Sequence, residues 1–470
     1  MRTLILTSLL ALSNLTGIAT AADGQLDPTF LTDAEVPGYG FYFNPNGTVN
    51  DSLDMVGAIV KRPDNKLWVV GRMKAPGAYR LSLYRVEPNG NPDVGFGDLG
   101  LRTVVQPCAG FYVADAKLDT QGRLLVAIND CADFMIYRFL PNGDLDANFA
   151  AGGVLSVPFN QGGSNIDLSQ KLIIAPNDDL IIAGRVATAT SGSLGIARFT
   201  SSGLPAPGFG AAGKVLIPFE WQVPAIYGVN GLHLMADGRI VIAGAISETN
   251  QGSSDKKQFV VRLTANGALD PSFGNSSAGI SKINHKSALG VAESPHTLAS
   301  LLMGDGSIVQ VGSVVSNNLN SAGDIFLMRW RPDGQLDTNI GLNGTRQYSL
   351  DFAGPNPSDP ALNWESANNI LRQDNGDLLI LASSKIGDSP ATAVMRLKSN
   401  LNIDTSFGSG GKVQYTMQIN NNGLHGQVGS AMMLQKGRIL FGGAVITGVN
   451  GRMQLMMGLQ HDEIFAHTFD

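Results

Sequence analysis

The stretch LDPTF at residues 26–30 recurs along the chain in a form that decides the fold. The later copies are PDVGF at 92–96, LDANF at 145–149, PAPGF at 205–209, LDPSF at 269–273, LDTNI at 336–340, LDTSF at 403–407 and the degraded FAHTF at 465–469. The last residues of these copies lie about 63 positions apart on average, and a fixed period of this kind is the signature of a repeat architecture. The sequence therefore predicts one closed array of seven units rather than several unlike domains.

Each unit contains the same series of short strands and turns. After the aromatic residue comes a Gly-rich turn and a short strand, as in GAAGKVLIPF at 210–219. A hairpin follows, LHLMADGRIVIAG at 232–244, whose Asp-Gly pair supplies the positive φ that a tight turn needs. A further strand ends in an arginine and another turn, as in VVRLTANG at 260–267. Four short strands repeated seven times predict an all-β fold, a seven-bladed β-propeller of four-stranded blades.

The hairpins of the GRI type, the arginine that precedes the next turn and the LDxSFGxxGxV string resemble the delta-60-repeat family of bacterial β-propeller proteins. The resemblance extends over nearly all of residues 24–470 and rests on motifs that recur in order. It implies the propeller fold and an exported or surface setting, and it implies no established reaction. Three copies depart from the pattern: PAPGF lacks Leu-Asp, LDTNI ends in Ile340, and FAHTF lacks both Leu-Asp and the following Gly.

The order of strands within a blade is predicted by analogy with other propellers. The hairpin should supply the two inner strands, the Arg-bearing strand the third, and the strand after LDxSFGxxG the outermost. The chain then begins with an outer strand at 38–44 and ends on a third strand at 453–460. We expect the N-terminal strand to complete the last blade, because this velcro closure leaves no edge open between the two ends of the ring.

Arginines at the ends of the third strands are followed eight residues later by aspartates. The pairs are Arg85–Asp93, Arg138–Asp146, Arg262–Asp270, Arg329–Asp337 and Arg396–Asp404. The seventh unit lacks both members, with Gly458 and Ala466 in their places, which is expected of a pair because an unpaired buried charge is costly. We interpret these residues as structural ion pairs within blades. Arg198 has Ala206 at the expected position and requires another partner.

The N-terminus has the features of a secretory signal peptide. Arg2 precedes an apolar run that ends in Ala19-Thr20-Ala21, the small-x-small pattern that signal peptidase reads. The run is too short to form a stable membrane span. We expect residues 1–21 to be removed near Ala21. Residues 22–470 would then form a single propeller domain that is secreted, periplasmic or associated with the cell envelope.

Composition and charge exclude several classes of protein. The chain has 33 Lys and Arg against 39 Asp and Glu, and a net charge of −6 excludes a broad basic surface for nucleic acid. Two cysteines are too few for a disulfide scaffold or for a four-ligand zinc site built from cysteine alone. In an oxidising compartment we expect Cys108 and Cys131 to form a disulfide, the alternative being two separate buried thiols.

Function in propellers usually concentrates at the end of the ring where the loops gather. Alignment of the inner strands on their hairpin turns puts these polar and varied residues at that end: Asp54, Tyr112, Asp167, Gly228, His296, Ser366 and Gln427. The loops that lead into them add Trp221, His285, Trp364 and His425. We expect this channel opening to bind an unknown protein or glycan, or calcium through its carboxylate and imidazole groups. The alternative is a solvated polar rim, and no cofactor is evident.

The sequence contains no GxSxG elbow, HExxH helix or GxxxxGK[ST] loop. This favours an exported binding or interaction module without a recognisable catalytic motif. The alternative is a propeller hydrolase or lyase that acts on an extracellular carbohydrate or lactone at the loop face of the channel. It would use Asp54, Asp167, His296 or His425. His233 lies between Leu232 and Leu234 inside an inner strand, and we interpret it as a structural histidine.

Overall fold

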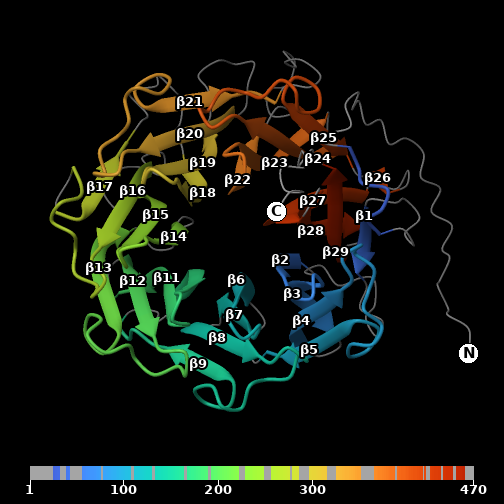
Figure 1. Ribbon diagram of the computed structural model, residues 1–470, viewed down its shortest axis with the longest axis horizontal. Coiled ribbons are helices and arrows are strands. Elements are labelled where there is room, and N and C mark those ends of the chain that lie inside the picture. Colours follow the sequence, from blue (N-terminus) through green and yellow to red (C-terminus); the bar gives the residue numbers. More distant parts are fainter. Residues whose placement is uncertain are drawn as a thin grey trace, which may run out of the picture.

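The structure is a computed structural model. It describes residues 25–31, 39–42, 55–75, 78–106, 111–129, 133–162, 167–188, 192–221, 228–247, 256–275, 278–284, 296–314, 324–350, 365–386, 389–416, 418–419, 424–435, 438–447 and 451–460. Every named regular element in these ranges is a β-strand. The strands form sheets that stand side by side around a common centre, so the fold is an all-β propeller (Figure 1).

The prediction of seven four-stranded blades is wrong. The structure has six blades of four strands each, and the remaining strands form one five-stranded sheet in the order β1-β29-β28-β27-β26. We call this the closing sheet. Its extra strand, β26 (Gln418–Ile419), pairs with the start of β27, which is 12 residues long where the other inner strands have six or seven. Because β26 lies between repeat units, the repeat pattern gave no sign of it.

The blades follow one another in chain order. Blade 1 contains β2 (Met55–Lys61), β3 (Leu67–Ala75), β4 (Ala78–Val86) and β5 (Leu101–Val105), and blade 2 contains β6 (Tyr112–Leu118), β7 (Leu124–Asn129), β8 (Phe134–Phe139) and β9 (Val154–Val157). Blade 3 contains β10 (Leu168–Ile174), β11 (Leu180–Ala187), β12 (Gly192–Phe199) and β13 (Lys214–Trp221), and blade 4 contains β14 (Val229–Leu234), β15 (Ile240–Ser247), β16 (Lys256–Leu263) and β17 (Ile280–Ile283). Blade 5 contains β18 (His296–Leu302), β19 (Ile308–Val314), β20 (Asp324–Trp330) and β21 (Thr345–Tyr348), and blade 6 contains β22 (Ser366–Arg372), β23 (Leu378–Ile386), β24 (Ser389–Leu397) and β25 (Lys412–Thr416).

The closing sheet joins the two ends of the chain. Its remaining strands are β27 (Leu424–Gln435), β28 (Arg438–Thr447), β29 (Gly451–Gln460) and the N-terminal β1 (Tyr39–Tyr42). β1 pairs antiparallel with β29, with Tyr39 opposite Met457 and Tyr42 opposite Gln454. The N-terminal strand therefore lies at the outer edge of this sheet, beside the last strand of the chain.

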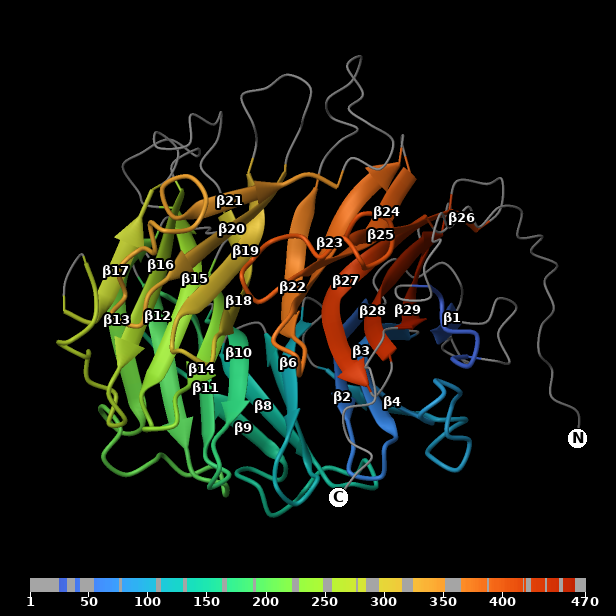
Figure 2. The same cartoon turned by 45° about the horizontal axis from the view of Figure 1, so that its top comes forward.

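Strand order within the blades agrees with the sequence prediction. In blade 4 the order is β14-β15-β16-β17, so the hairpin supplies the two inner strands and the strand after the motif is outermost. The inner strands of adjacent blades pack side by side around the centre, β10 against β14 and β14 against β18 (Figures 1 and 2). Figure 1 shows β5, β9, β13, β17 and β21 at the outer rim. The inner strands therefore form the wall on which side chains from neighbouring blades meet.

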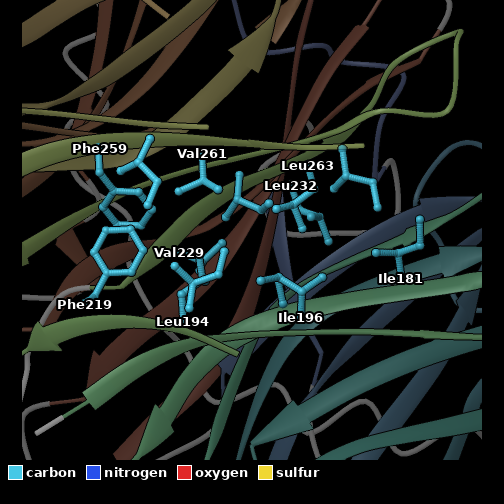
Figure 3. Close-up of a cluster of buried hydrophobic side chains, with 14 of the residues drawn as sticks. Ile181, Leu194, Ile196, Phe219, Val229, Leu232, Phe259, Val261 and Leu263 are labelled. Carbon is cyan, nitrogen blue, oxygen red and sulfur yellow. The ribbon is translucent and has the colours of Figure 1, made fainter. Parts of the chain in front are cut away.

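The hydrophobic core is divided into layers between adjacent blades. One layer joins blades 3 and 4 and contains Ile196, Phe219, Leu232, Phe259 and Val261, all buried (Figure 3). The Phe219 and Phe259 rings lie 4.8 Å apart between centroids. Because each strand is apolar on the side facing its neighbour, a blade buries its surfaces only against the blades beside it. Stability therefore depends on a complete ring.

The LDxSF motif fastens each third strand to the next blade. Arg262 Nε lies 2.7 Å from Asp270 Oδ2, the Arg262 guanidinium lies 4.4 Å from the centroid of the Phe273 ring, and its Nη1 donates to Pro332 O of blade 5 at 2.6 Å. Phe30 of the first copy packs against Gly90 of blade 1, which has φ +86°. A Cβ at Gly90 would stand 2.6 Å from the Phe30 ring, so this turn requires glycine.

Candidate functional site on the inner wall of the ring

Several residues predicted for the channel opening lie outside the described residues. These are Asp54, Trp364, His285 and both cysteines of the predicted disulfide, Cys108 and Cys131. For three others the structure describes the backbone alone: His296 begins β18, His425 lies in β27 and Trp221 ends β13. The gathering of these side chains at one site therefore stays a prediction, and so does the disulfide.

The alignment of the opening residues is off by one position in blades 1 and 3. In blade 1 the residue equivalent to Tyr112 is Met55, which pairs with Arg72, and Asp54 precedes it in sequence. Tyr112 pairs with Asn129 in blade 2, and the equivalent residue of blade 3 is Leu168, which pairs with Arg185. Asp167 precedes that pair and lies one residue before β10. Successive side chains of a strand point to opposite faces. Asp167 is therefore not at the position in blade 3 that Tyr112 occupies in blade 2. Tyr112 and Leu168 stand at the same distance before the second strand of their hairpins, which begins at Leu124 and Leu180, and both inner strands carry the same bulge. The error therefore lies in the sequence alignment, which placed Asp167 one residue too early.

Asp167 is a buried structural acid. Its Oδ1 accepts a hydrogen bond from Ala187 N at 3.1 Å and its Oδ2 accepts one from Phe159 N at 3.2 Å. Burial raises the pKa of Asp167, although these two bonds act in the opposite direction. Glu365 holds the same place before β22 and accepts from Leu350 N at 2.9 and 2.8 Å. Both acids therefore fix the chain that follows an outer strand, and both oxygens of Asp167 already have donors.

Tyr112 is the predicted opening residue that the structure places most clearly at the surface. Its side chain is 49% exposed, and the Arg72 guanidinium lies 4.3 Å from the centroid of its ring. Arg72 is itself buried, donates from Nη1 to Phe111 O at 2.8 Å and lies 5.4 Å from the Tyr79 ring. Arg72 therefore packs on the Tyr112 ring while the tyrosine stays accessible to solvent.

The structure also brings together residues that the sequence analysis did not combine. Asp115 and Lys117 come from β6, Lys171 from β10, His233 from β14 and Ser300 from β18. We call these five residues the inner-wall cluster. His233 Nε2 lies 2.9 Å from Ser300 Oγ across the boundary between blades 4 and 5. Lys117 Nζ lies 2.6 Å from Asp115 Oδ1. Each of the five side chains is half-buried.

The polar pair His233–Ser300 departs from the repeat at both of its positions. The strand pairing shows which residues of the six blades are equivalent to Ser300: Ile59, Ala116, Leu172, Leu232 and Ile370. The residues equivalent to His233 are Val60, Lys117, Ile173, Leu301 and Leu371. Two positions that are almost always apolar are thus polar together and in contact. The packing of the ring does not require this pair, since the other blades form without it.

Glycine makes room for the pair. A Cβ at Gly231 would stand 1.6 Å from Ser300 Oγ and 2.8 Å from His233 Nε2. The equivalent residues of the other blades all carry side chains: Ala58, Asp115, Lys171, Ala299 and Asn369. Only Gly therefore permits this contact between β14 and β18.

The charges of the inner-wall cluster fix its protonation. Burial, together with the nearby Lys171 charge, lowers the pKa of His233 to about 4, so the imidazole is neutral at pH 7. Burial also lowers the pKa of Lys171; Asp115 opposes this shift and Lys117 adds to it. Among the described residues, Lys171 Nζ has no hydrogen bond or ion pair, whereas Lys117 is paired with Asp115.

The apolar residues that flank His233 in the sequence predicted a structural histidine. Its polar character at a position that is mostly apolar becomes evident when the equivalent residues of all inner strands are compared. That comparison requires the strand register. Within the described part of the chain, no three His, Cys, Asp or Glu side chains gather closely enough to hold a metal ion. In the same residues, no helix is long and apolar enough to cross a membrane.

Three stretches match the family model described as "Domain of unknown function (DUF5122) beta-propeller", at residues 62–96, 236–273 and 373–407. Each match runs from a hairpin turn through the third strand to the end of an LDxSF copy. The chain therefore contains β-propeller repeats. Among the curated proteins no sequence matches the chain.

Solved structures with similar folds have varied roles. Puromycin hydrolase is 14% identical with a TM-score of 0.46; the match covers 91% of this chain but 57% of that one, so this chain spans little more than half of its length. Polysaccharide lyase Uly1 is 10% identical, with a TM-score of 0.48 and 95% and 99% of the two chains covered. Drosophila Plexin A in complex with Semaphorin 1b is 10% identical with a TM-score of 0.44, and the match covers 93% of this chain and 88% of that one. These similarities concern the fold alone.

Proposed function

We propose that this β-propeller is an exported binding module that holds a small anionic ligand on the inner wall of the ring, at Lys171. The observation that carries the proposal is the half-buried Lys171 ammonium, which has no ion-pair partner among the described residues. A partly buried charge without a counter-charge is unfavourable. A bound anion would supply that counter-charge, and its binding free energy would include the relief of this cost.

Asp115 is poorly placed to neutralise Lys171, although its charge raises the pKa of that lysine. Its Oδ1 already accepts from Lys117 Nζ at 2.6 Å and from Ala116 N at 2.9 Å. Its Oδ2 accepts from Leu172 N at 3.1 Å. The carboxylate is therefore committed to its own strand and to the backbone of blade 3. Lys171 is the cation of the cluster that is left for a ligand.

The test is the binding of inorganic phosphate and propionate, measured by calorimetry and by thermal unfolding at pH 7. Both anions should bind the natural protein, and a ligand at about 100 times its Kd should stabilise the fold by about 2.7 kcal/mol. Lys171→Met should abolish both effects. Lys61→Met is the matched control, because Lys61 ends the inner strand β2 but is exposed. Equal binding by Lys171→Met would overturn the proposal, as would no binding by the natural protein.

Export is part of the proposal and rests on residues 1–21 and on the resemblance to delta-60-type repeats. N-terminal sequencing of the mature protein should place the cleavage near Ala21. Thiol titration of the denatured protein should find no free thiol if Cys108 and Cys131 form the expected disulfide. Two titratable thiols would exclude that bond.

A hydrolase is the second candidate function, and the His233–Ser300 contact favours it. A distance of 2.9 Å between an imidazole nitrogen and a hydroxyl is that of a general base and a nucleophile. We rank it second because a histidine with a pKa of about 4 is a weak base at neutral pH. A fluorophosphonate probe should label Ser300 if the serine is activated. Equal labelling of Ser300→Ala would exclude this role.

A protein or glycan partner at the loop face is supported by the exposed Tyr112 ring on Arg72, since Tyr and Arg are enriched in binding hot spots. Tyr112→Ala should weaken capture of such a partner without lowering the melting temperature. Calcium at this face would need Asp54, His296 or other residues whose side chains are not described, because both oxygens of Asp167 have donors. A calcium titration of the melting temperature tests that site.

A further inference from the structure

We infer that the ligand of the inner-wall cluster is a small hydroxy acid, with its carboxylate on Lys171 and its hydroxyl on the His233–Ser300 pair. The inference rests on the proposed function and narrows the chemical class of the ligand. It starts from three adjacent inner strands: β10 carries Lys171 and packs against β14, and His233 of β14 contacts Ser300 of β18. Lys171 is close enough to His233 for its charge to lower the pKa of the imidazole.

The His233–Ser300 pair retains hydrogen-bonding capacity after its own contact is made. A neutral imidazole has one donor and one acceptor nitrogen, and a hydroxyl has one donor hydrogen and two lone pairs. The contact between Nε2 and Oγ uses one hydrogen and one lone pair. In the residues that the structure describes, Nδ1 of His233 has no other hydrogen-bond partner. The pair can therefore donate one further hydrogen bond and accept another.

An alcohol is the ligand group that fits this pair best. A second carboxylate would not fit, since His233 carries no positive charge at pH 7. An apolar group would leave the remaining donor and acceptor of the pair without partners, which costs about 1–3 kcal/mol for a buried group. A hydroxyl can both donate and accept, so it can bind Ser300 Oγ whichever member of the pair supplies the hydrogen of their contact.

The backbone of β14 carries no side chain where it passes the pair. The residue of β14 beside the pair is Gly231, and any side chain there would collide with Ser300 Oγ. Lys171 occupies the equivalent position in the neighbouring blade, so the two residues lie at the same level of the wall. A short molecule bound to Lys171 therefore meets the His233–Ser300 pair across a glycine.

The experiment compares lactate with propionate, two monocarboxylates of the same length that differ by one hydroxyl. The natural protein should bind lactate about tenfold more tightly than propionate, the effect expected of one additional hydrogen bond. Ser300→Ala should reduce lactate affinity to that of propionate and leave propionate unchanged. The variant should fold, because Ala116 occupies the equivalent position in blade 2. Ser399→Ala, in an exposed turn, is the matched control.

The outcomes separate the two proposals. Equal affinities of the natural protein for lactate and propionate would overturn the hydroxy-acid inference, while loss of both ligands in Lys171→Met would still support the anion site. An unchanged preference for lactate in Ser300→Ala would also overturn the inference. Failure of the natural protein to bind either acid would overturn both proposals. Gly231→Ala, with its fold checked by circular dichroism, should remove the preference for lactate as Ser300→Ala does.

Discussion

Blade 3 and the closing sheet each lack one member of the repeated Arg–Asp pair, and they replace it in opposite ways. Blade 3 keeps Arg198 but has Ala206 where the other blades have aspartate. The joint loss expected for the seventh unit is wrong for this sheet: the N-terminal copy of the motif supplies the aspartate, Asp27, and only the arginine is missing, with Gly458 in its place. In both cases the replacement comes from the same place, the residue that follows the hairpin turn.

In blade 3 the replacement is an acid. Asp179 Oδ2 lies 2.8 Å from Arg198 Nη2 and 3.0 Å from Nε. Arg198 therefore has the partner that the sequence analysis required but did not identify. Ala206 is buried and apolar, so it cannot pair with Arg198, and Asp179 supplies the counter-charge instead.

In the closing sheet the replacement is a cation. Arg438 forms an ion pair with the buried Asp27 and donates to Thr29 Oγ1 at 2.8 Å and to Pro88 O at 2.9 Å. Its guanidinium lies 4.9 Å from the Phe30 ring. These contacts tie the N-terminal motif to β28 and to blade 1, so Arg438 takes over the role that Arg262 has in blade 4.

The comparison shows that three positions face one another in the ring: the residue after the hairpin turn, the end of the third strand and the motif aspartate. Blade 4 fills all three, with Arg239, Arg262 and Asp270 in contact. Blade 1 does the same with Lys66, Arg85 and Asp93. Each of these sheets retains at least one acid and one cation in contact, because a buried charge without a partner is costly.

The largest effect is expected from deletion of residues 24–44. This removes β1, Phe30 and Asp27 together, so Arg438 loses its partner and β29 loses its outer neighbour. Loss of a buried ion-pair partner costs about 3–5 kcal/mol and loss of a buried Phe a similar amount. Urea unfolding should show the truncated chain to be far less stable and prone to aggregation. Unchanged unfolding would refute the role of the closing sheet.

Low pH should produce the next largest effect, because several motif acids are protonated together. Burial raises the pKa of Asp27, but hydrogen bonds from Thr29 and Arg438 lower it by more. The pKa values of Asp93 and Asp404 are also lowered, because hydrogen bonds and cationic partners outweigh burial there too. A depressed pKa in the folded state contributes stability that is present above the unfolded value of about 3.9. That stability is lost as the pH falls through the lower folded values. Unfolding free energy measured from pH 6 to pH 2 should fall below about pH 4, and a flat profile would contradict this account.

Asp270→Asn should be the most damaging single substitution among the pairs. It removes the partner of Arg262 and weakens the contact with Arg239, and both Arg262 and Asp270 are buried. We expect a loss of about 3 kcal/mol in urea unfolding. Asp237→Asn is the matched control, because Asp237 also pairs with Arg239 but is exposed. Equal losses for the two variants would show that burial does not decide the value of the pair.

Asp179→Asn should cost less, about 1–3 kcal/mol, because Arg198 is more accessible to solvent than Arg262. The sharper test is the double variant Asp179→Asn with Ala206→Asp, which moves the acid to its usual place in the repeat. Recovery of the melting temperature would show that the place of the acid is interchangeable. A double variant no better than Asp179→Asn would mean that blade 3 has lost the geometry of the other blades.

The smallest effect is expected for Asp337→Asn. Arg329 Nε lies 3.7 Å from Asp337 Oδ2, too far for a hydrogen bond, and donates instead to Ser307 Oγ at 3.0 Å. The loss should stay below about 1 kcal/mol, because the substitution weakens a long ion pair and removes no hydrogen bond from Arg329. Asp404→Asn serves as the comparison, because Arg396 Nε lies 2.7 Å from Asp404 Oδ2, and it should cost clearly more.

The sequence by itself determined the features that repeat within short distances along the chain. The LDxSF period, the Asp-Gly hairpin turns and the arginine eight residues before each aspartate specified a propeller and the order of strands in its blades. These features depend on local conformation and on contacts within one unit. The same pattern therefore recurs in each copy, and this repetition allows the features to be predicted from the sequence.

Only the tertiary structure decided what depends on register and on neighbouring units. The strand β26 made the last sheet five-stranded, and Asp179 and Arg438 replaced missing partners from another strand. His233 and Ser300 are 67 residues apart in sequence and meet because adjacent inner strands pack side by side. Such contacts follow from how far each strand slides along the next, and the spacing of residues in the sequence does not fix that distance.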